Sequence, residues 1–328
     1  MFAFGPINSR RLGQSLGINN IPPKHCSYAC TYCQVGHTDR MKITRQPFFE
    51  PEAIVTDVAQ RIEQILHQGG TIDFLSFVPD GEPTLDLHLG REIELLKPLG
   101  YPIAVFTNAS LIWKADVREV LCKADWVSLK VDAVDEHIWH KINRPHGHLR
   151  QNEILEGMLS FADMFSGTLV TETMLVQGLN DTERNFKNIA RFLKRLQPDI
   201  AYLAIPLRPT AEANIHPPQE MTVNQAYQIF HAVLPRVECL ITPDDDKIGY
   251  SGDVEADILR TTAVHPLTEA AIARLLERSH AKWDTIHKLI AQGDLREIIR
   301  GRERFYIRCF PRETSSEKKA GQHTTTRH

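Results

Sequence analysis

The sequence predicts an α/β fold whose parallel strands form an open or partial barrel. First, between residues 50 and 234, short apolar runs alternate with longer segments whose apolar residues recur every three or four positions. Second, the 328 residues are 42% hydrophobic and 24% charged, which suits a sizeable core and about two domains. Third, six cysteines are too sparse for a disulfide scaffold. Repeated strand–helix units imply right-handed crossovers, with chemistry at the C-terminal strand ends.

Helices and strands alternate along this region. A helix begins at Pro51, carries Ile54, Val58 and Ile62 on one face, and closes at Gly69. Further helices are expected near Leu87–Lys97, at Asp116–Lys123, within Asn152–Phe165, from Glu183 to the residue before Pro198, and at Val223–Leu234. Strands are expected at Ile72–Val78, Pro102–Thr107, Trp126–Val131, Thr168–Val176 and Ile200–Ile205. A loop is expected around His137, His140, His146 and His148.

The chain changes character after about residue 250. Thr268 is expected to cap a helix through Glu277, and Ser279 to cap a second helix, Ala281–Gln292. Two strand-like segments, Leu295–Ile299 and Arg304–Arg308, then flank a hairpin turn. This order is typical of a winged helix-turn-helix module. The predicted organisation is a barrel domain at 1–240, a linker at 241–252 containing Asp244–Asp246, the winged helix at 253–312 and a disordered tail at 313–328.

The charge pattern limits the partners that the chain can have. The formal net charge of −3 does not mark the whole chain as a nucleic-acid binder. From Tyr250 onward, however, 14 basic side chains face 11 acidic ones, and five arginines surround the hairpin: Arg296, Arg300, Arg302, Arg304 and Arg308. These arginines can contact RNA or DNA phosphates, or can belong to a protein-docking or solvated face.

We expect a cytoplasmic protein without a membrane segment. No uninterrupted apolar run approaches the roughly 18 residues of a membrane span. Ser9-Arg10-Arg11-Leu12 resembles a twin-arginine export signal, but no apolar region follows it.

The strongest motif is a cysteine cluster. Cys26, Cys30 and Cys33 lie within eight residues, so one tight loop can aim three thiolates at a common centre. One interpretation is a structural zinc site with His25 or His37 as the fourth ligand. The other is a [4Fe–4S] cluster, in which three cysteines leave one iron open for a substrate or cofactor. The remaining cysteines, which we expect to be small core residues, are Cys122, Cys239 and Cys309.

The Cys-x3-Cys-x2-Cys spacing, with aromatic Tyr32 before the last cysteine, resembles the signature of the radical S-adenosylmethionine (SAM) superfamily. The segment from Phe4 to Pro22 is similar to an uncharacterised group related to the tRNA wyosine synthases. The resemblance covers about residues 2–235. It implies a partial (β/α)6 TIM-like barrel, with the cluster loop following the first strand. It also implies one [4Fe–4S] cluster on the three cysteines and reductive cleavage of SAM to a 5′-deoxyadenosyl radical.

The same resemblance assigns SAM contacts at the strand ends. Asp80-Gly81-Glu82 stands where the family has a Gly-Gly-Glu-like motif, so Gly81 would allow close backbone approach and Glu82 would pair with the methionine ammonium. Asp80 replaces the first family glycine. Polar groups for the SAM carboxylate and ribose would come from Asn108, Lys130 and Asp132, although Lys130 equally suits a strand-end salt bridge. Adenine contacts would come from Tyr32, Val176 and Ile205.

Three functions compete at this point. The first is modification of a tRNA or other RNA base, and the second is modification of a peptide or protein, including activation of a glycyl-radical partner. The third is a zinc-bearing winged-helix regulator without catalysis. Either enzyme would need an electron donor such as flavodoxin or ferredoxin. No residue is assigned to hydrogen abstraction, but Arg10 and Arg11 can bind a substrate phosphate or carboxylate.

Overall fold

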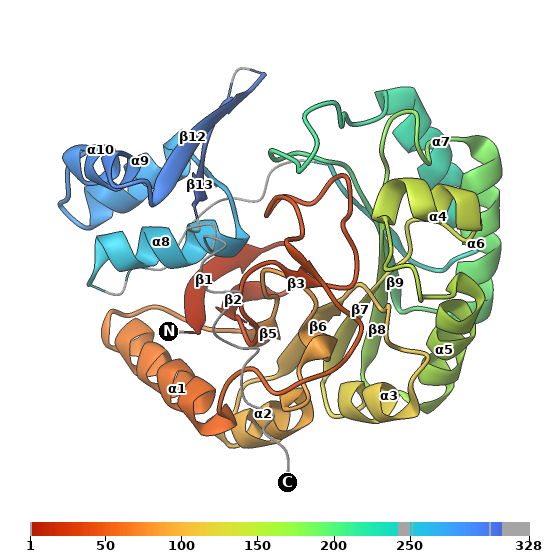
Figure 1. Cartoon of the computed structure of the whole chain (residues 1–328), viewed down its shortest axis with the longest axis horizontal. Coiled ribbons are helices and arrows are strands. Elements are labelled where there is room, and N and C mark those ends of the chain that lie inside the picture. The colour runs from red at the N-terminus through yellow and green to blue at the C-terminus, as the bar shows by residue number, and fades with distance from the viewer. Residues whose placement is uncertain (1, 242–249, 251, 302, 310–328) are drawn as a thin grey trace, which may run out of the picture.

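A computed structural model describes residues 2–241, 250, 252–301 and 303–309. Within them, eight strands form one open sheet in the order β1-β2-β5-β6-β7-β8-β9-β10. Their bounds are β1 Ala3–Ser9, β2 Gly13–Ile18, β5 Phe74–Phe77, β6 Ile103–Thr107, β7 Trp126–Lys130, β8 Thr168–Met174, β9 Ile200–Ala204 and β10 Val237–Leu240. The sheet curves into the half-barrel of an α/β fold (Figure 1). The expected open barrel is confirmed.

The strand count differs from the expected six. From β2 to β10 all neighbours are parallel, which makes seven parallel strands, and β1 adds an antiparallel edge beside β2. The additional parallel strand is β10, whose four residues pair with β9. Edge strands of this length lack the continuous apolar run that marks a strand buried on both faces.

Helices surround the convex side of the sheet (Figure 1). They are α1 Pro51–His67, α2 Leu89–Leu96, α3 Ala115–Leu121, α4 Glu136–Asn143, α5 Gln151–Met164, α6 Glu183–Leu196 and α7 Glu220–His231, with short 3-10 turns at Pro83–Leu85 and Lys97–Leu99. The helix expectations are confirmed within a few residues, except for α4. The loop expected around His137 and His140 is wrong there, because Asp135 accepts a hydrogen bond from the Ile138 amide and starts a helix.

The described residues between 252 and 309 form a separate group of helices and strands above β1 (Figure 1). Its elements are α8 Val254–Val264, β11 Leu267–Thr268, α9 Glu269–Arg278, α10 Asp284–Ala291, β12 Leu295–Arg300 and β13 Glu303–Arg308, with the strands ordered β11-β13-β12. We call this part the C-terminal module. Thr268 caps α9 as expected, through the Ala271 amide. The cap assigned to Ser279 is wrong, because Ser279 ends α9 and α10 begins only at Asp284.

The C-terminal module is attached to the barrel by polar contacts. Arg61 of α1 forms an ion pair with Asp257 of α8 at 2.9 Å, and both side chains are buried. Arg300 of β12 donates to the carbonyl oxygens of Arg208 and Ile215. The expected disordered tail, Arg302 and the acidic part of the expected linker lie outside the described residues. Among the described helices, none is both long and apolar enough to cross a membrane.

Candidate functional site

The cysteine loop follows β2 and lies over the C-terminal edge of the sheet. Its first part forms β3 (His25–Cys26), which pairs with β4 (Arg40–Met41). The amide of Glu82 donates to the carbonyl of His25 at 3.1 Å, tying the loop to the end of β5. The amide of Thr31 donates to the carbonyl of Ile142 at 3.0 Å, tying it to the end of α4. The loop is therefore held at both sides of its cysteines.

Gly81 is required for this attachment. Its φ is +154°, and a Cβ placed on it would lie 1.9 Å from the carbonyl oxygen of His25. A side chain at this position would collide with the backbone of the cysteine loop. The close approach expected at Gly81 is thus made to His25, through the bridge between these two residues.

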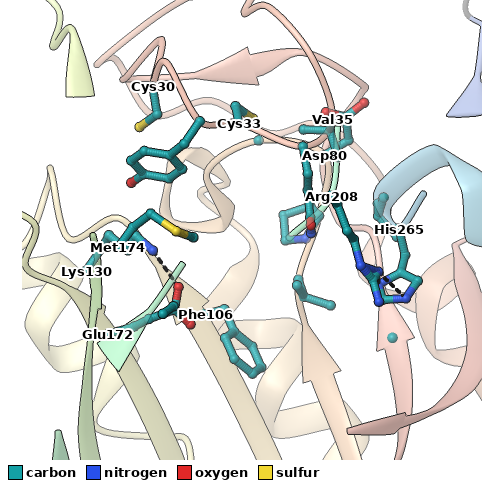
Figure 2. A pocket seen from close by; sticks show the side chains of 18 of the residues that line it. Cys30, Cys33, Val35, Asp80, Phe106, Lys130, Glu172, Met174, Arg208 and His265 are labelled. Carbon is teal, nitrogen blue, oxygen red and sulfur yellow. Dashed lines mark hydrogen bonds and ion pairs between the residues drawn. The ribbon is translucent and has the colours of Figure 1, made fainter. Parts of the chain in front are cut away.

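A cavity of about 400 Å³ opens between the cysteine loop, the strand ends and the C-terminal module. In Figure 2, Cys30 and Cys33 lie on one side of it, Lys130 and Glu172 on its floor, and Arg208 and His265 on another side. Seven of the predicted site residues line it: Cys26, Cys30, Tyr32, Cys33, Gly81, Lys130 and Ile205. Four do not, namely Glu82, Asn108, Asp132 and Val176.

The three thiols share a buried environment. Burial raises the pKa of Cys30 to about 12, raises that of Cys33, and raises that of Cys26 well above its usual range. Thiols in this state stay protonated until a metal replaces the protons. In the described part of the chain, no three His, Cys, Asp or Glu side chains converge as a single metal ion would require.

This donor set fits an iron–sulfur cubane better than a closed zinc site. A cubane binds each thiolate through a different iron, so its ligands surround a larger body than one ion. His25, one of the two expected zinc ligands, is not among the cavity residues, and its Nδ1 lies 3.2 Å from the carbonyl oxygens of Pro22 and Pro23. His37 does line the cavity.

The carboxylate of Glu82 forms hydrogen bonds with neighbouring residues of the protein. It accepts hydrogen bonds from the hydroxyls of Thr84 and Thr107, both at 2.6 Å, and from the backbone amide of Asn108 at 2.7 Å. Burial raises the pKa of Glu82, and these hydrogen bonds oppose the shift. Glu82 therefore joins the ends of β5 and β6, whereas the resemblance expected it to face the ligand.

Asp132 has a similar internal role. It accepts hydrogen bonds from the hydroxyl of Tyr32, from the side-chain amide of Asn143 at 2.7 Å and from the backbone amide of Met174 at 2.7 Å. Val176 lies nearby in a small buried cluster against which Tyr32 packs. Asp132 and Val176 thus hold Tyr32, which lines the cavity, from behind the cavity wall.

Lys130 forms the salt bridge that the sequence left open as an alternative. Its Nζ pairs with Glu172 of β8 and lies 4.9 Å from the centre of the Tyr32 ring. Arg11 pairs with the second carboxylate oxygen of Glu172 and lies over Phe106 at 4.6 Å. Although burial opposes ionisation, Lys130 and Arg11 lower the pKa of Glu172 to about 2. The cavity floor is therefore a fixed cation–carboxylate–cation group.

Asp80 adds a second buried carboxylate to the wall. Burial raises its pKa to about 6, while Lys24, with Nζ 3.2 Å from Oδ2, partly offsets this shift. The position at which the family pattern has glycine thus carries a titratable group that lines the cavity.

Sequence reasoning missed four residues of the site. Glu172 was detectable as the one charge in the expected strand Thr168–Val176, whereas Asn143 lies at the end of the unpredicted helix α4. Arg208 and His265, whose Nη1 and Nδ1 atoms are 2.8 Å apart, come from the loop after β9 and from the end of α8. No local motif marks His265, because it reaches the cavity only through the docking of the C-terminal module.

Residues 20–193 match the family model of the radical SAM superfamily, and this match covers more than half of the chain. The chain belongs to this superfamily and is an enzyme of the radical SAM type. Within it, the chain is 44% identical over 308 residues to a UPF0026 protein of Methanocaldococcus jannaschii, covering 93% of this chain and 95% of that protein.

Two further comparisons define the extent of the similarity. The chain is 28% identical over 299 residues to the GTPase Obg of Brachyspira hyodysenteriae, which is 90% of this chain but only 43% of that protein. The crystal structure of a radical SAM methyltransferase from Sphaerobacter thermophilus superposes with a TM-score of 0.52 and 16% identity, over 70% of this chain and 67% of that one. At this identity the superposition shows the fold alone.

Proposed function

We propose that Cys26, Cys30 and Cys33 hold one [4Fe–4S] cluster and that SAM binds in the adjoining cavity. The observation that carries this proposal is that three thiols of one loop, closely spaced in sequence, line the same cavity at the C-terminal edge of the sheet. When bound and reduced by a donor such as flavodoxin or ferredoxin, the cluster would supply one electron for cleavage of the C5′–S bond of SAM, which would give methionine and a 5′-deoxyadenosyl radical for hydrogen abstraction from the substrate.

The residues of this chain place and enclose the reactants. Tyr32 and Ile205 offer apolar surface for the adenine, and Lys130 offers a cation at the cavity floor. Asn108, Asp132, Glu82 and Val176 act from behind the wall, by fixing the strand ends and the cysteine loop. Gly81 sets the distance between that loop and β5. The C-terminal module closes one side of the cavity through Val264 and His265, which helps to exclude water.

For the domains we propose a barrel at 1–240, a linker at 241–252 and a winged-helix module at 253–312. The order helix, helix, hairpin and the separate buried core around Ile272 and Leu289 support the last assignment. Four of its basic side chains are already engaged: Arg304 with Glu297, Arg308 with Asp294, Lys288 with Glu255, and Arg300 with the barrel.

The resemblance to the wyosine synthases favours a base of tRNA or another RNA as the substrate, and a peptide or protein is the alternative. The basic residues suited to RNA are the exposed Arg296 and Lys282 of the C-terminal module. A native gel with bulk tRNA separates the alternatives. Binding that weakens in an Arg296→Ala/Lys282→Ala variant, with a shallower salt dependence, favours RNA. Absence of any shift favours the peptide.

The cluster assignment is tested with Cys26→Ala. After anaerobic reconstitution the variant should lack absorption at about 400 nm. It should also form no 5′-deoxyadenosine when SAM is added with dithionite as the reductant. The matched control is Cys122→Ala, because Cys122 ends α3 and is not among the cavity residues. The wild type and this control should each bind about four irons per chain. Normal 5′-deoxyadenosine formation by Cys26→Ala would remove the assignment, and about eight irons per chain would indicate a second cluster.

A further inference from the structure

Two asparagine side chains face the cysteine sulfurs. Nδ2 of Asn108, directly after β6, lies 3.5 Å from Sγ of Cys26. Nδ2 of Asn143, the last residue of α4, lies 3.4 Å from Sγ of Cys30. Both distances are those of N–H···S hydrogen bonds. No corresponding side-chain amide contacts Cys33 in the described residues; its hydrogen bond comes from the backbone at Val35.

The hydrogen-bond network determines which end of each amide faces the sulfur. Oδ1 of Asn108 accepts from the backbone amide of Ser110 at 2.9 Å, so its NH2 group is the end left for Cys26. Asn143 lies 2.7 Å from Oδ2 of Asp132, and an ionised carboxylate can only accept. Asn143 must therefore present its NH2 group to Asp132, and the same group contacts Cys30. Neither amide can be reversed without breaking a hydrogen bond.

Both amides are also held in place independently of any cluster. Asn108 donates to the Ser27 hydroxyl at 2.9 Å, and its backbone amide donates to Glu82. Asn143 is buried and contacts the Tyr32 hydroxyl at 3.1 Å. Because these partners fix the two side chains, the N–H groups remain beside the sulfurs in both redox states and need no rearrangement during electron transfer.

From this geometry we infer that Asn108 and Asn143 set the reduction potential of the cluster by donating hydrogen bonds to two of its three cysteine sulfurs. The inference rests on the proposed function, since it requires the three thiols to be the cluster ligands. Hydrogen bonds to the sulfurs are one of the factors that tune iron–sulfur potentials. Reduction adds one electron from the flavodoxin or ferredoxin, and the added charge spreads onto the sulfurs. The two amides therefore stabilise the reduced state and make this electron transfer easier. This role is proposed for Asn108 beside the SAM contact that the resemblance implies.

The test is the midpoint potential of the reconstituted protein, measured by EPR during a dye-mediated titration. Removing one donor, in Asn143→Ala or Asn108→Ala, should shift the reduction equilibrium three- to tenfold toward the oxidised cluster, a potential lower by about 30–60 mV for one electron. The matched control is Asn185→Ala, which removes a buried amide that donates to the carbonyl of Asn180. Its potential should equal that of the wild type.

The outcomes separate this inference from the proposed function. If the wild type binds a cluster and both variants keep its potential and iron content, the inference is wrong and the cluster assignment stands. If the wild type binds no cluster, both fail. If one variant does not retain iron, the other decides, because each asparagine faces a different sulfur. Asn143→Ser and Asn108→Ser, which keep a donor on a shorter side chain, should recover part of the lost potential.

Discussion

Gly81→Ala tests how the cysteine loop is held on the sheet. The added Cβ would lie 1.9 Å from the His25 carbonyl oxygen and 2.7 Å from Cδ1 of Ile21. Contacts of this kind are not found below about 3.0 Å, so the loop and the end of β5 must separate by roughly 1 Å. That movement breaks the backbone hydrogen bonds from Glu82 to His25, at 3.1 Å, and from Lys24 to Asp80, at 2.9 Å.

The expected cost follows from these contacts. Two backbone hydrogen bonds contribute about 0.5–1.5 kcal/mol each, and a positive φ costs a residue with a side chain about 1–2 kcal/mol. The free energy of unfolding should fall by about 2–5 kcal/mol in total, which lowers Tm by about 3–7 °C in a chain of 328 residues. Because the displaced segment carries Cys26, retained iron should also fall below that of other variants of equal stability.

The assay is urea denaturation of the reduced apoprotein, with iron quantified after reconstitution. The control is Gly178→Ala, since Gly178 has φ +72° but open space around its Cβ position. This control carries the φ penalty without the collision and should lose only about 1–2 kcal/mol. The reasoning is refuted if Gly81→Ala matches Gly178→Ala in both stability and iron content.

Two further predictions concern stability. Burial and the neighbouring Asp86 raise the pKa of Glu92 to about 9, so its stabilising contribution is complete below the unfolded pKa near 4.5 and is lost as the pH rises toward about 9. The free energy of unfolding of the wild type should therefore fall by up to about 1.4 kcal/mol per pH unit in this window. Glu92→Gln should reduce the fall in Tm measured from about pH 6 to pH 9. Equal slopes of Tm against pH in the wild type and the variant would contradict this prediction. Asp257→Ala leaves Arg61 buried and unpaired, which should cost about 3–5 kcal/mol in urea denaturation, whereas Arg61→Met/Asp257→Leu should recover most of this loss. A double variant as unstable as the single one would show that the pair itself attaches the C-terminal module.

The strand and helix positions of the barrel were predictable because parallel strands buried on both faces are continuous apolar runs. The run at Phe74–Phe77 and the one-sided apolar pattern from Pro51 to His67 are examples. Helix α4 was not predicted from the sequence, because its eight residues bury little beyond Trp139 and Ile142 and histidines occupy its exposed side. Helix α8 was not predicted because its buried face mixes the polar side chains of Asp257, Thr261 and Thr262 with apolar ones, and Asp257 is paired with Arg61 of the barrel.

The same difference separates the site residues that could be predicted from those that could not. The cysteines were predictable because a chelating loop needs its ligands close in sequence, and here it draws all three from eight residues. For Glu172 the sequence gave only a single charge within a strand, and for His265 it gave no signal, because each reaches the cavity from a distant segment. A pattern within one segment carries no information about which strand lies beside it.

The polar residues at the strand ends show what a sequence motif can and cannot specify. The resemblance gave Glu82, Asn108 and Asp132 one role, contact with SAM. In the structure, their side chains form hydrogen bonds that connect neighbouring strands, the cysteine loop and helix α4. Glu82 joins β5 to β6, Asn108 joins β6 to the cysteine loop, and Asp132 joins β7 to α4 through Asn143. Since these hydrogen bonds place Cys26 and Cys30 before any ligand arrives, substitutions at the three positions should lower iron retention and shift the potential before they weaken SAM binding. The motif therefore marks the frame that holds the cysteine loop, in addition to the contact with SAM that the resemblance implies.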